Sequence, residues 1–182
     1  MEKLKIFIVK SCMFLVLCLT GLSSSTMIVH ADTYSESEVR EMYEIPTDIS
    51  IERQKILITA LSLKGKIPYE WGGKPQNAGW NERWNNGGGL DCSGFVKWVY
   101  WTALGIDSGL ESTGTISGRC QRIKESELQP GDLGLMFQGS SSESVTNHVG
   151  IYMGNGTWIH CTAGRGVVVD EGYRYFKYFV RP

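Results

Sequence analysis

The chain is 182 residues long, which is the length of one domain with room for a sizeable hydrophobic core. Its 18 basic side chains nearly balance 19 acidic ones, so the net charge is −1 and the pI is near 6.3. This balance gives no electrostatic reason to expect nucleic acid or an anionic membrane as a partner. The 22 glycines and 11% aromatic residues are typical of a compact fold with many turns and short strands.

Residues 1–31 have the layout of a secretory signal peptide. Three early lysines precede an apolar run from Cys12 to Leu19, and a small-residue cleavage pattern ends at Ala31. We therefore expect a secreted protein of the extracellular space or cell wall, with a mature start near Asp32. The alternative is an uncleaved anchor, but the run is shorter than the ~20 apolar residues that span a bilayer. We expect no stable membrane insertion after the signal is removed.

The mature chain is predicted to consist of a short N-terminal segment, residues 32–49, and one domain, residues 50–182. Apolar residues in the first segment have near-helical spacing before Pro46, which fits either a short helix or a tether. Ser50 is expected to cap a core-packing helix that runs to Lys64.

A second helix is predicted where a glycine-rich loop gives way to Asp91 and Cys92. Apolar side chains then recur at steps of three and four residues until Gly105. Asp91 suits the N-cap, so Cys92 falls in the first turn, where unpaired N–H groups and the helix dipole stabilise a thiolate. Cys92 is therefore our candidate nucleophile. The alternative is a small buried residue, the commonest fate of a free cysteine.

The rest of the chain alternates short extended segments with turns. After glycine-rich turns over residues 105–118, extended segments are expected at 120–123, 133–137, 148–153, 157–161, 167–170 and 175–180. The Ser-rich stretch 139–146 is predicted to be a surface loop. Helices come first and strands follow, which predicts an α+β fold with the cysteine helix packed on an antiparallel sheet.

Three tryptophans precede the cysteine helix, and they are costly to leave in water. They either pack their loop against the domain or line a groove for a ligand. We expect packing for Trp71, and both options stay open for Trp80 and Trp84.

A thiol nucleophile needs a base, and His148 and His160 are the histidines outside the signal segment. The Asn155-Gly156 turn places them on paired strands, but an ideal two-residue hairpin offsets them by about three residues, about 10 Å. A bulge would close part of this gap. If the rings meet, His148 takes the thiol proton or forms an ion pair with the thiolate, and His160 orients it. Backbone N–H groups at the helix start would then stabilise the oxyanion.

Two other interpretations of these residues compete with catalysis. A zinc site made of Cys92, His148 and His160 lacks a fourth close-spaced ligand and carboxylates to orient the imidazoles, so we expect no metal or other cofactor. Alternatively, both histidines are ordinary strand residues. That is the better interpretation of either histidine alone, whereas the combination with Cys92 favours catalysis.

Three cysteines follow the predicted signal peptide, namely Cys92, Cys120 and Cys161. An odd number in an oxidising compartment suggests one free thiol and one disulfide. A Cys120–Cys161 disulfide would leave Cys92 free.

Four groups of residues stand in a characteristic order along the chain. They are Tyr69-x-Trp71-Gly72-Gly73, then Asp91-Cys92-Ser93-Gly94-Phe95-Val96, then Leu128-x-Pro130-Gly131-Asp132-Leu133, and finally His148 to Gly154 with Trp158-Ile159-His160. They closely resemble the NlpC family of papain-like cell-wall endopeptidases, from about Ile51 to Pro182. The resemblance implies a papain-like α+β fold with a Cys-His-His triad of Cys92, His148 and His160.

The resemblance also implies a substrate, peptidoglycan or soluble muropeptides. Such enzymes cleave stem peptides, typically between D-glutamate and a diamino acid, through a thioester. Tyr69 would face the cysteine and assist the oxyanion or the substrate, while Asp91 and Ser93 would bind the amino-terminal side of the stem peptide. The alternatives are an N-acetylmuramoyl-L-alanine amidase with the same residues, acyl transfer to an amine, or a non-catalytic wall-binding module.

Two features depart from the family pattern. The segment from Lys74 to Gly89 is longer than the usual link between the tyrosine and cysteine motifs, so Tyr69 is the least secure of the transferred residues. Cys161 stands where a small residue is more usual and would place a second thiol near the site.

Overall fold

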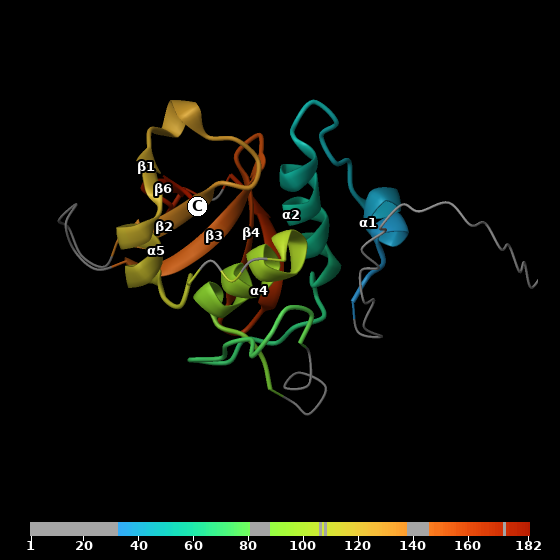
Figure 1. The fold of residues 1–182 in the computed structure, drawn as a ribbon, viewed down its shortest axis with the longest axis horizontal. Coiled ribbons are helices and arrows are strands. Elements are labelled where there is room, and N and C mark those ends of the chain that lie inside the picture. The colour runs from blue at the N-terminus through green and yellow to red at the C-terminus, as the bar shows by residue number, and fades with distance from the viewer. Residues whose placement is uncertain (1–32, 81–87, 106, 108, 138–145, 173) are drawn as a thin grey trace, which may run out of the picture.

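The computed structural model of the protein describes residues 33–80, 88–105, 107, 109–137, 146–172 and 174–182 (Figure 1). Its helices are α1 (Glu36–Met42), α2 (Ile51–Ser62), α4 (Cys92–Leu104), α5 (Thr113–Arg119) and the 3-10 helix η1 (Glu125–Glu127). Its strands are β1 (Gln121–Ile123), β2 (Leu133–Phe137), β3 (Thr146–Gly154), β4 (Thr157–Thr162), β5 (Gly166–Glu171) and β6 (Tyr178–Arg181).

The described strands form one six-stranded antiparallel sheet in the order β1-β6-β2-β3-β4-β5. Helix α4 packs on β3 and β4 and also on α2, while α1 packs on the outer side of α2 (Figure 1). The main core lies between these layers and includes Phe95 and Val99 of α4, Val149 of β3 and Ile159 of β4. The predicted α+β architecture is therefore confirmed.

The two N-terminal helices begin at serine caps. Ser35 and Glu38 form a reciprocal capping box at the start of α1, which makes the acidic segment a helix. Val39 anchors it because its side chain is fully buried, and the Tyr34 N–H donates to the Ser62 carbonyl at 2.9 Å. The predicted Ser50 cap of α2 is confirmed, although this helix ends at Ser62, earlier than expected.

The cysteine helix α4 has the predicted bounds. The Asp91 carboxylate accepts a hydrogen bond from the Gly94 N–H at 2.7 Å, and Gly105 closes the helix in the left-handed region with φ of 69°.

Helix α5 was not expected, because Gly114 and Gly118 each lower helix propensity by about 1 kcal/mol. A capping box between Ser112 and Thr115 and the buried side chain of Ile116 compensate for that cost.

The strands follow the predicted order with shifted ends. Strand β3 begins at Thr146, two residues before the prediction, and β6 begins at Tyr178, three residues later than expected. The rest of the predicted Ser-rich loop lies outside the described residues.

A buried charge cluster explains the predicted turn before β2. Asp132 is 1% exposed, and its carboxylate contacts Arg53 of α2 at 3.1 Å and Arg181 of β6 at 2.7 Å. It also accepts a hydrogen bond from the Gln129 N–H at 2.8 Å, and Tyr100 of α4 donates to the Gly131 carbonyl. This cluster joins two helices, a turn and a strand, so its role is structural.

The tryptophans have different environments. The Trp71 side chain is 87% exposed, so the prediction that it packs against the domain is wrong. It occupies a tight turn in which the Gly73 N–H donates to the Glu70 carbonyl at 2.9 Å, and this turn directs the indole outward. Trp80 is buried, and its carbonyl accepts a hydrogen bond from the Trp98 indole at 3.1 Å. Trp84 lies outside the described residues.

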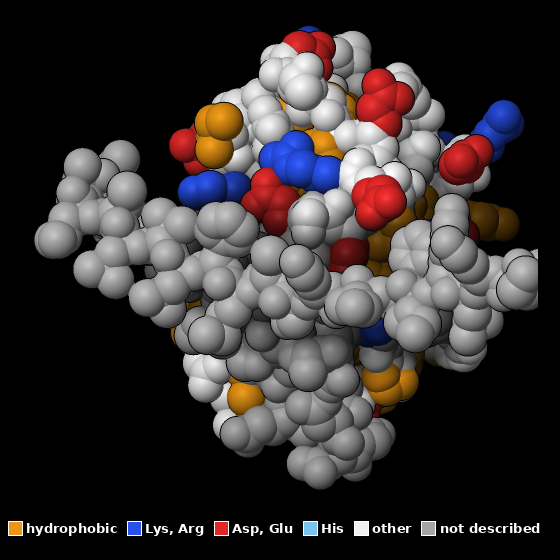
Figure 2. Space-filling view, turned by 90° about the vertical axis from the view of Figure 1, so that its right-hand side faces the viewer, with side chains coloured by type: hydrophobic (Ala, Val, Ile, Leu, Met, Phe, Trp, Pro, Cys, Tyr) orange, Lys and Arg blue, Asp and Glu red, His pale blue; other side chains and the backbone are white. Residues whose placement is uncertain are grey.

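The surface agrees with the balanced composition. Acidic and basic side chains lie close together on the described part of the face that carries α1 (Figure 2). Within the described residues, the helices are too short or too polar to cross a lipid bilayer.

Candidate active site

Cys92 is the first residue of α4 and is 7% exposed. Burial raises the pKa of its thiol, and the Asp91 carboxylate raises it further. The Val149 N–H of β3, the Lys74 ammonium and the Ser93 N–H oppose this shift by favouring the thiolate. The predicted stabilisation by the helix start is therefore present, but desolvation is larger and keeps the thiol protonated.

The two neighbours of Cys92 form a closed polar cluster with Lys74. The Asp91 carboxylate accepts hydrogen bonds from the Gly94 N–H at 2.7 Å and from the Ser93 hydroxyl at 2.9 Å. The Lys74 ammonium donates to both Asp91 oxygens and to the Ser93 hydroxyl, the last at 2.7 Å. Asp91 and Ser93 thus lie at the helix start as expected, but Lys74 already neutralises Asp91. A substrate amine would have to displace this lysine.

His148 and His160 meet across the β3–β4 hairpin. His148 Nε2 lies 2.7 Å from His160 Nδ1. The register shifts by one residue between Tyr152 and Gly154, and Ile151 then pairs with Ile159. The same register places His160 opposite Gly150, so His148 is its diagonal neighbour two residues along. The bulge and this diagonal contact together close the gap of the ideal hairpin.

Gly150 makes the diagonal contact sterically possible. A Cβ atom at this position would lie 3.2 Å from the His160 Cβ and 2.7 Å from the Phe176 Cζ. Phe176 is 3% exposed, stacks on the His148 ring with a 5.9 Å centroid distance and meets the edge of His160 at 6.0 Å. Neither Gly150 nor Phe176 was predicted to shape the site, although a glycine inside a predicted strand is a signal of close approach.

Asp170 of β5 extends the chain of polar contacts beyond His160. Its Oδ2 lies 2.9 Å from His160 Nε2, while Arg165 contacts the same carboxylate through two nitrogens at 2.9 and 2.6 Å. Arg165, followed by His160, lowers the pKa of Asp170 to about 2. Asp170 pairs with Trp158 in the sheet, and His160 pairs with Val168, so this contact is also diagonal. Asp170 was not predicted as a site residue.

Both imidazoles are neutral at pH 7. Burial, helped by the neighbouring His160, lowers the pKa of His148 to about 4. Burial also lowers the pKa of His160, although Asp170 partly opposes that shift. Burial thus favours the neutral forms of the thiol and of both imidazoles.

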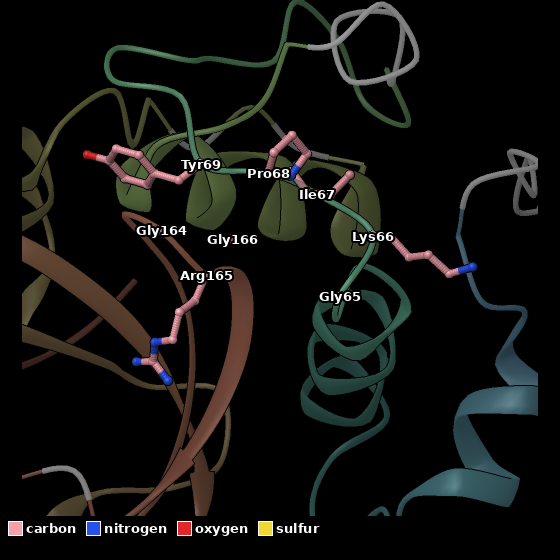
Figure 3. Close-up of a pocket in the computed structure, with 8 residues that line it drawn as sticks. All are labelled: Gly65, Lys66, Ile67, Pro68, Tyr69, Gly164, Arg165 and Gly166. Atoms are coloured by element: carbon pink, nitrogen blue, oxygen red, sulfur yellow. The ribbon is translucent and has the colours of Figure 1, made fainter.

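Tyr69 lies near the cysteine helix through backbone pairing with Leu90. Burial raises the pKa of its hydroxyl, and negative charge on Cys92 and Asp91 raises it further. Tyr69 also lines a hollow of about 470 Å³ between residues 65–69 and the β4–β5 turn, residues 164–166 (Figure 3). Figure 3 shows Arg165 leaving that turn and pointing away from the loop that carries Tyr69.

The other two cysteines are free thiols, so the predicted Cys120–Cys161 disulfide is absent. Cys161 is fully buried on β4, and its thiol donates to the Leu90 carbonyl at 3.1 Å. Burial, and then negative charge on Cys92, raises the pKa of Cys161. Cys120 is half-buried at the C-terminus of α5.

A thiol at a helix N-terminus, packed on an antiparallel strand that carries an imidazole, defines the papain-like class of fold. A model of the NlpC/P60 family matches residues 65–180. The chain therefore belongs to the NlpC/P60 family. In the described part of the chain, no group of three or more His, Cys, Asp or Glu side chains is arranged to hold a metal ion.

Two similar proteins are named as DL-endopeptidases. The chain is 38% identical over 114 residues to the peptidoglycan DL-endopeptidase CwlO of Bacillus licheniformis, covering 62% of this chain and 23% of that protein. It is 34% identical over 125 residues to the bifunctional muramidase/DL-endopeptidase CwlT of Bacillus subtilis, covering 67% of this chain and 31% of that one. The chain thus spans a third or less of either relative.

Two solved structures share the fold. The NlpC/p60 domain of the peptidoglycan hydrolase SagA is 30% identical with a TM-score of 0.55, and the match covers 71% of this chain and 98% of that one. RipD of Mycobacterium tuberculosis, described as a non-catalytic, peptidoglycan-binding NlpC/p60 protein, is 21% identical with the same TM-score and covers 73% and 98%. RipD supports the fold alone.

Proposed function

We propose that the protein is a cysteine endopeptidase that hydrolyses peptidoglycan stem peptides, at the bond between D-glutamate and the diamino acid. The observation that carries this proposal is the arrangement of the proposed triad. Cys92 interacts with the Val149 N–H, and His148, the preceding residue of β3, is held by His160 at 2.7 Å. The relationship to DL-endopeptidases supports the choice of bond.

The first half of the reaction acylates Cys92. His148 Nε2 contacts His160, so the other nitrogen of His148, Nδ1, accepts the thiol proton as the sulfur attacks the carbonyl carbon. The new S–C bond places negative charge on the carbonyl oxygen. Backbone N–H groups at the start of α4 and the Tyr69 hydroxyl are the donors that stabilise this oxyanion.

Acylation is complete when the tetrahedral intermediate collapses to the Cys92 thioester. The C–N bond breaks, and His148 gives its proton to the leaving amine of the diamino acid. In the second half, water attacks the thioester carbon while His148 Nδ1 takes a proton from the water. The C–S bond then breaks and His148 returns this proton to the sulfur, which restores the Cys92 thiol. The glutamyl acid is released and loses its own proton to solvent.

Two other functions are compatible with the same residues and fold. An amidase would use these residues to cut the muramoyl–L-alanine linkage, and a non-catalytic module would bind the cell wall without cutting it. We favour the endopeptidase over a binding module because a binding surface does not need a thiol beside two coupled imidazoles.

Export remains part of the proposal. The lysines and apolar run before Ala31 support a signal peptide, and we propose that cleavage yields a chain beginning near Asp32. The intact mass of the protein recovered from the culture medium or cell wall tests this. A mass that includes residues 1–31 would contradict it.

Digestion of purified peptidoglycan, read by mass spectrometry, tests the choice of reaction. We expect new amino groups on the diamino acid with the wild-type protein and none with Cys92→Ala. Release of intact stem peptides from glycan would identify an amidase. Equal sacculus binding by both proteins without products would support the binding module.

A further inference from the structure

We propose that Asp170 and Arg165 together form a positioning pair that fixes which ring nitrogens of His148 and His160 carry protons. This inference rests on the proposed function of the site and adds two residues to its machinery. Neither residue belongs to the proposed triad. Both act through His160, which is fully buried on β4.

The contacts from Asp170 through His160 to His148 determine which ring nitrogens carry protons. The Asp170 carboxylate is ionised and can only accept, so His160 Nε2 donates to it across 2.9 Å. A neutral imidazole has a single N–H, so His160 Nδ1 must then accept. The partner of that nitrogen is His148 Nε2 at 2.7 Å, which must donate. The lone pair of His148 is thereby left on Nδ1, the nitrogen that receives the thiol proton.

Arg165 prevents the negative charge of Asp170 from changing the protonation of the two imidazoles. A bare carboxylate against a buried imidazole favours the imidazolium. Arg165 contacts both carboxylate oxygens, at 2.9 and 2.6 Å, and its positive charge lowers the pKa of His160. If His160 were protonated, both of its nitrogens would donate. His148 would then have to accept at Nε2 and carry its proton on Nδ1, where it could no longer act as the base.

Among the described residues, the charged and titratable groups that act on His160 include His148 on β3, Asp170 on β5 and Arg165 in the β4–β5 turn. Phe176 packs against both imidazoles without a charge. The two members of the positioning pair therefore have opposite effects on His160. Loss of Asp170 removes the acceptor and the negative charge, while loss of Arg165 leaves the negative charge unbalanced.

Histidine NMR on the protein from Asp32 onward tests this directly, because only His148 and His160 remain there. The described elements all lie within this span. At pH 7 the wild-type spectrum should show protons on Nε2 and lone pairs on Nδ1 for both rings. Asp170→Ala should give a mixture of tautomers. It should also reduce kcat at least about tenfold, since Nδ1 of His148 then carries a proton in part of the molecules and cannot accept one from the thiol.

Arg165→Gln should act in the opposite direction. His160 should titrate at higher pH than in the wild-type protein, and the acid limb of kcat/KM against pH should move to higher pH by the same amount. Activity above that limb should remain within about threefold of wild type. The matched control is Glu171→Gln, which removes an exposed carboxylate next to Asp170 and should change neither the spectra nor the pH profile.

Two results would overturn the positioning pair. One is a wild-type spectrum with the proton on Nδ1 of either ring. The other is an Asp170→Ala protein whose histidine tautomers and pH profile both match the control. The proposed function can fail separately. A wild-type protein with the expected tautomers that hydrolyses no stem peptide would support the positioning pair and contradict the endopeptidase activity.

Discussion

In the proposed reaction Cys92 must lose a proton to attack a carbonyl carbon, and its surroundings in the folded chain oppose that loss. Burial and the Asp91 carboxylate raise the pKa of the thiol, while burial lowers the pKa of His148 to about 4. Both shifts oppose proton transfer from the thiol to the imidazole. We therefore propose that the thiol ionises as substrate binds, when the carbonyl carbon and the oxyanion donors share the developing charge.

Alkylation of Cys92 by iodoacetamide should follow this electrostatic balance. The thiolate is the reactive form, so the alkylation rate at pH 7 should be low. The rate should rise about tenfold per pH unit and should continue to rise above the ordinary thiol pKa of about 8.5. A preformed ion pair with His148 would instead give a fast plateau from about pH 4 upward. The Cys92→Ala protein corrects for labelling of Cys120, which is half-buried and free.

At the scale of elements, the site depends on how three strands align. The register shift in β3 and the missing side chain at Gly150 bring His148 within hydrogen-bond distance of His160. The register of β4 with β5 then places Asp170 on the other side of His160. The two histidines and the aspartate form one slanted line across β3, β4 and β5.

Replacement of Gly150 by alanine should disrupt the contact between His148 and His160. The new methyl group would lie 2.7 Å from Phe176 and 3.2 Å from the His160 Cβ, so one of these buried rings must move. We expect kcat/KM to fall at least about tenfold with a loss of stability of about 1–3 kcal/mol. Kinetics on a defined stem peptide, with thermal unfolding in parallel, measures both.

Gly118→Ala is the matched control, because a Cβ at that position of α5 meets nothing within 4 Å. It should leave activity unchanged and raise stability by roughly 0.5–1 kcal/mol. Full activity in Gly150→Ala would show that the close packing at this glycine does not position the histidines.

The elements of the fold were more predictable than the contacts between them. Helix α4 followed from the sequence because the Asp91 cap, the apolar stripe and Gly105 all indicate the same bounds. The meeting of His148 and His160 depends on a one-residue bulge, which no pattern in the hairpin marks. Asp170 looked like an ordinary strand residue until the β4–β5 register was known. The helix position that favours a thiolate at Cys92 is visible in the sequence, whereas the burial that opposes it is not.

At the scale of the whole molecule, one buried charge cluster joins the helices α2 and α4 to the sheet. Asp132 is the acceptor for Arg53 of α2 and Arg181 of β6, while Tyr100 ties α4 to the same turn. These contacts join the turn before β2 to α2, α4 and β6. The family motif around Pro130 and Asp132 therefore has a structural role.

Asp132→Ala should destabilise the fold by about 3–5 kcal/mol, because two arginines lose their shared buried partner. Arg40→Ala, which breaks an exposed pair with Glu36 on α1, should change stability by no more than about 1 kcal/mol. Chemical denaturation measures both, and activity per folded molecule should be unaffected. A fall in that activity at constant stability would give Asp132 a part in the site.

The most direct test of Cys92 as the proposed nucleophile is the time course of hydrolysis of L-alanyl-γ-D-glutamyl-diamino acid-D-alanine by the wild-type protein, Cys92→Ala and Cys161→Ala. Cys161 is a matched control because it is also a buried free thiol, and the two are close enough for charge on Cys92 to raise the pKa of Cys161. We expect two dipeptide products from the wild-type protein, at least about a 1,000-fold loss in Cys92→Ala and near wild-type rates in Cys161→Ala. Hydrolysis by Cys92→Ala at the wild-type rate would contradict the role of Cys92 as nucleophile.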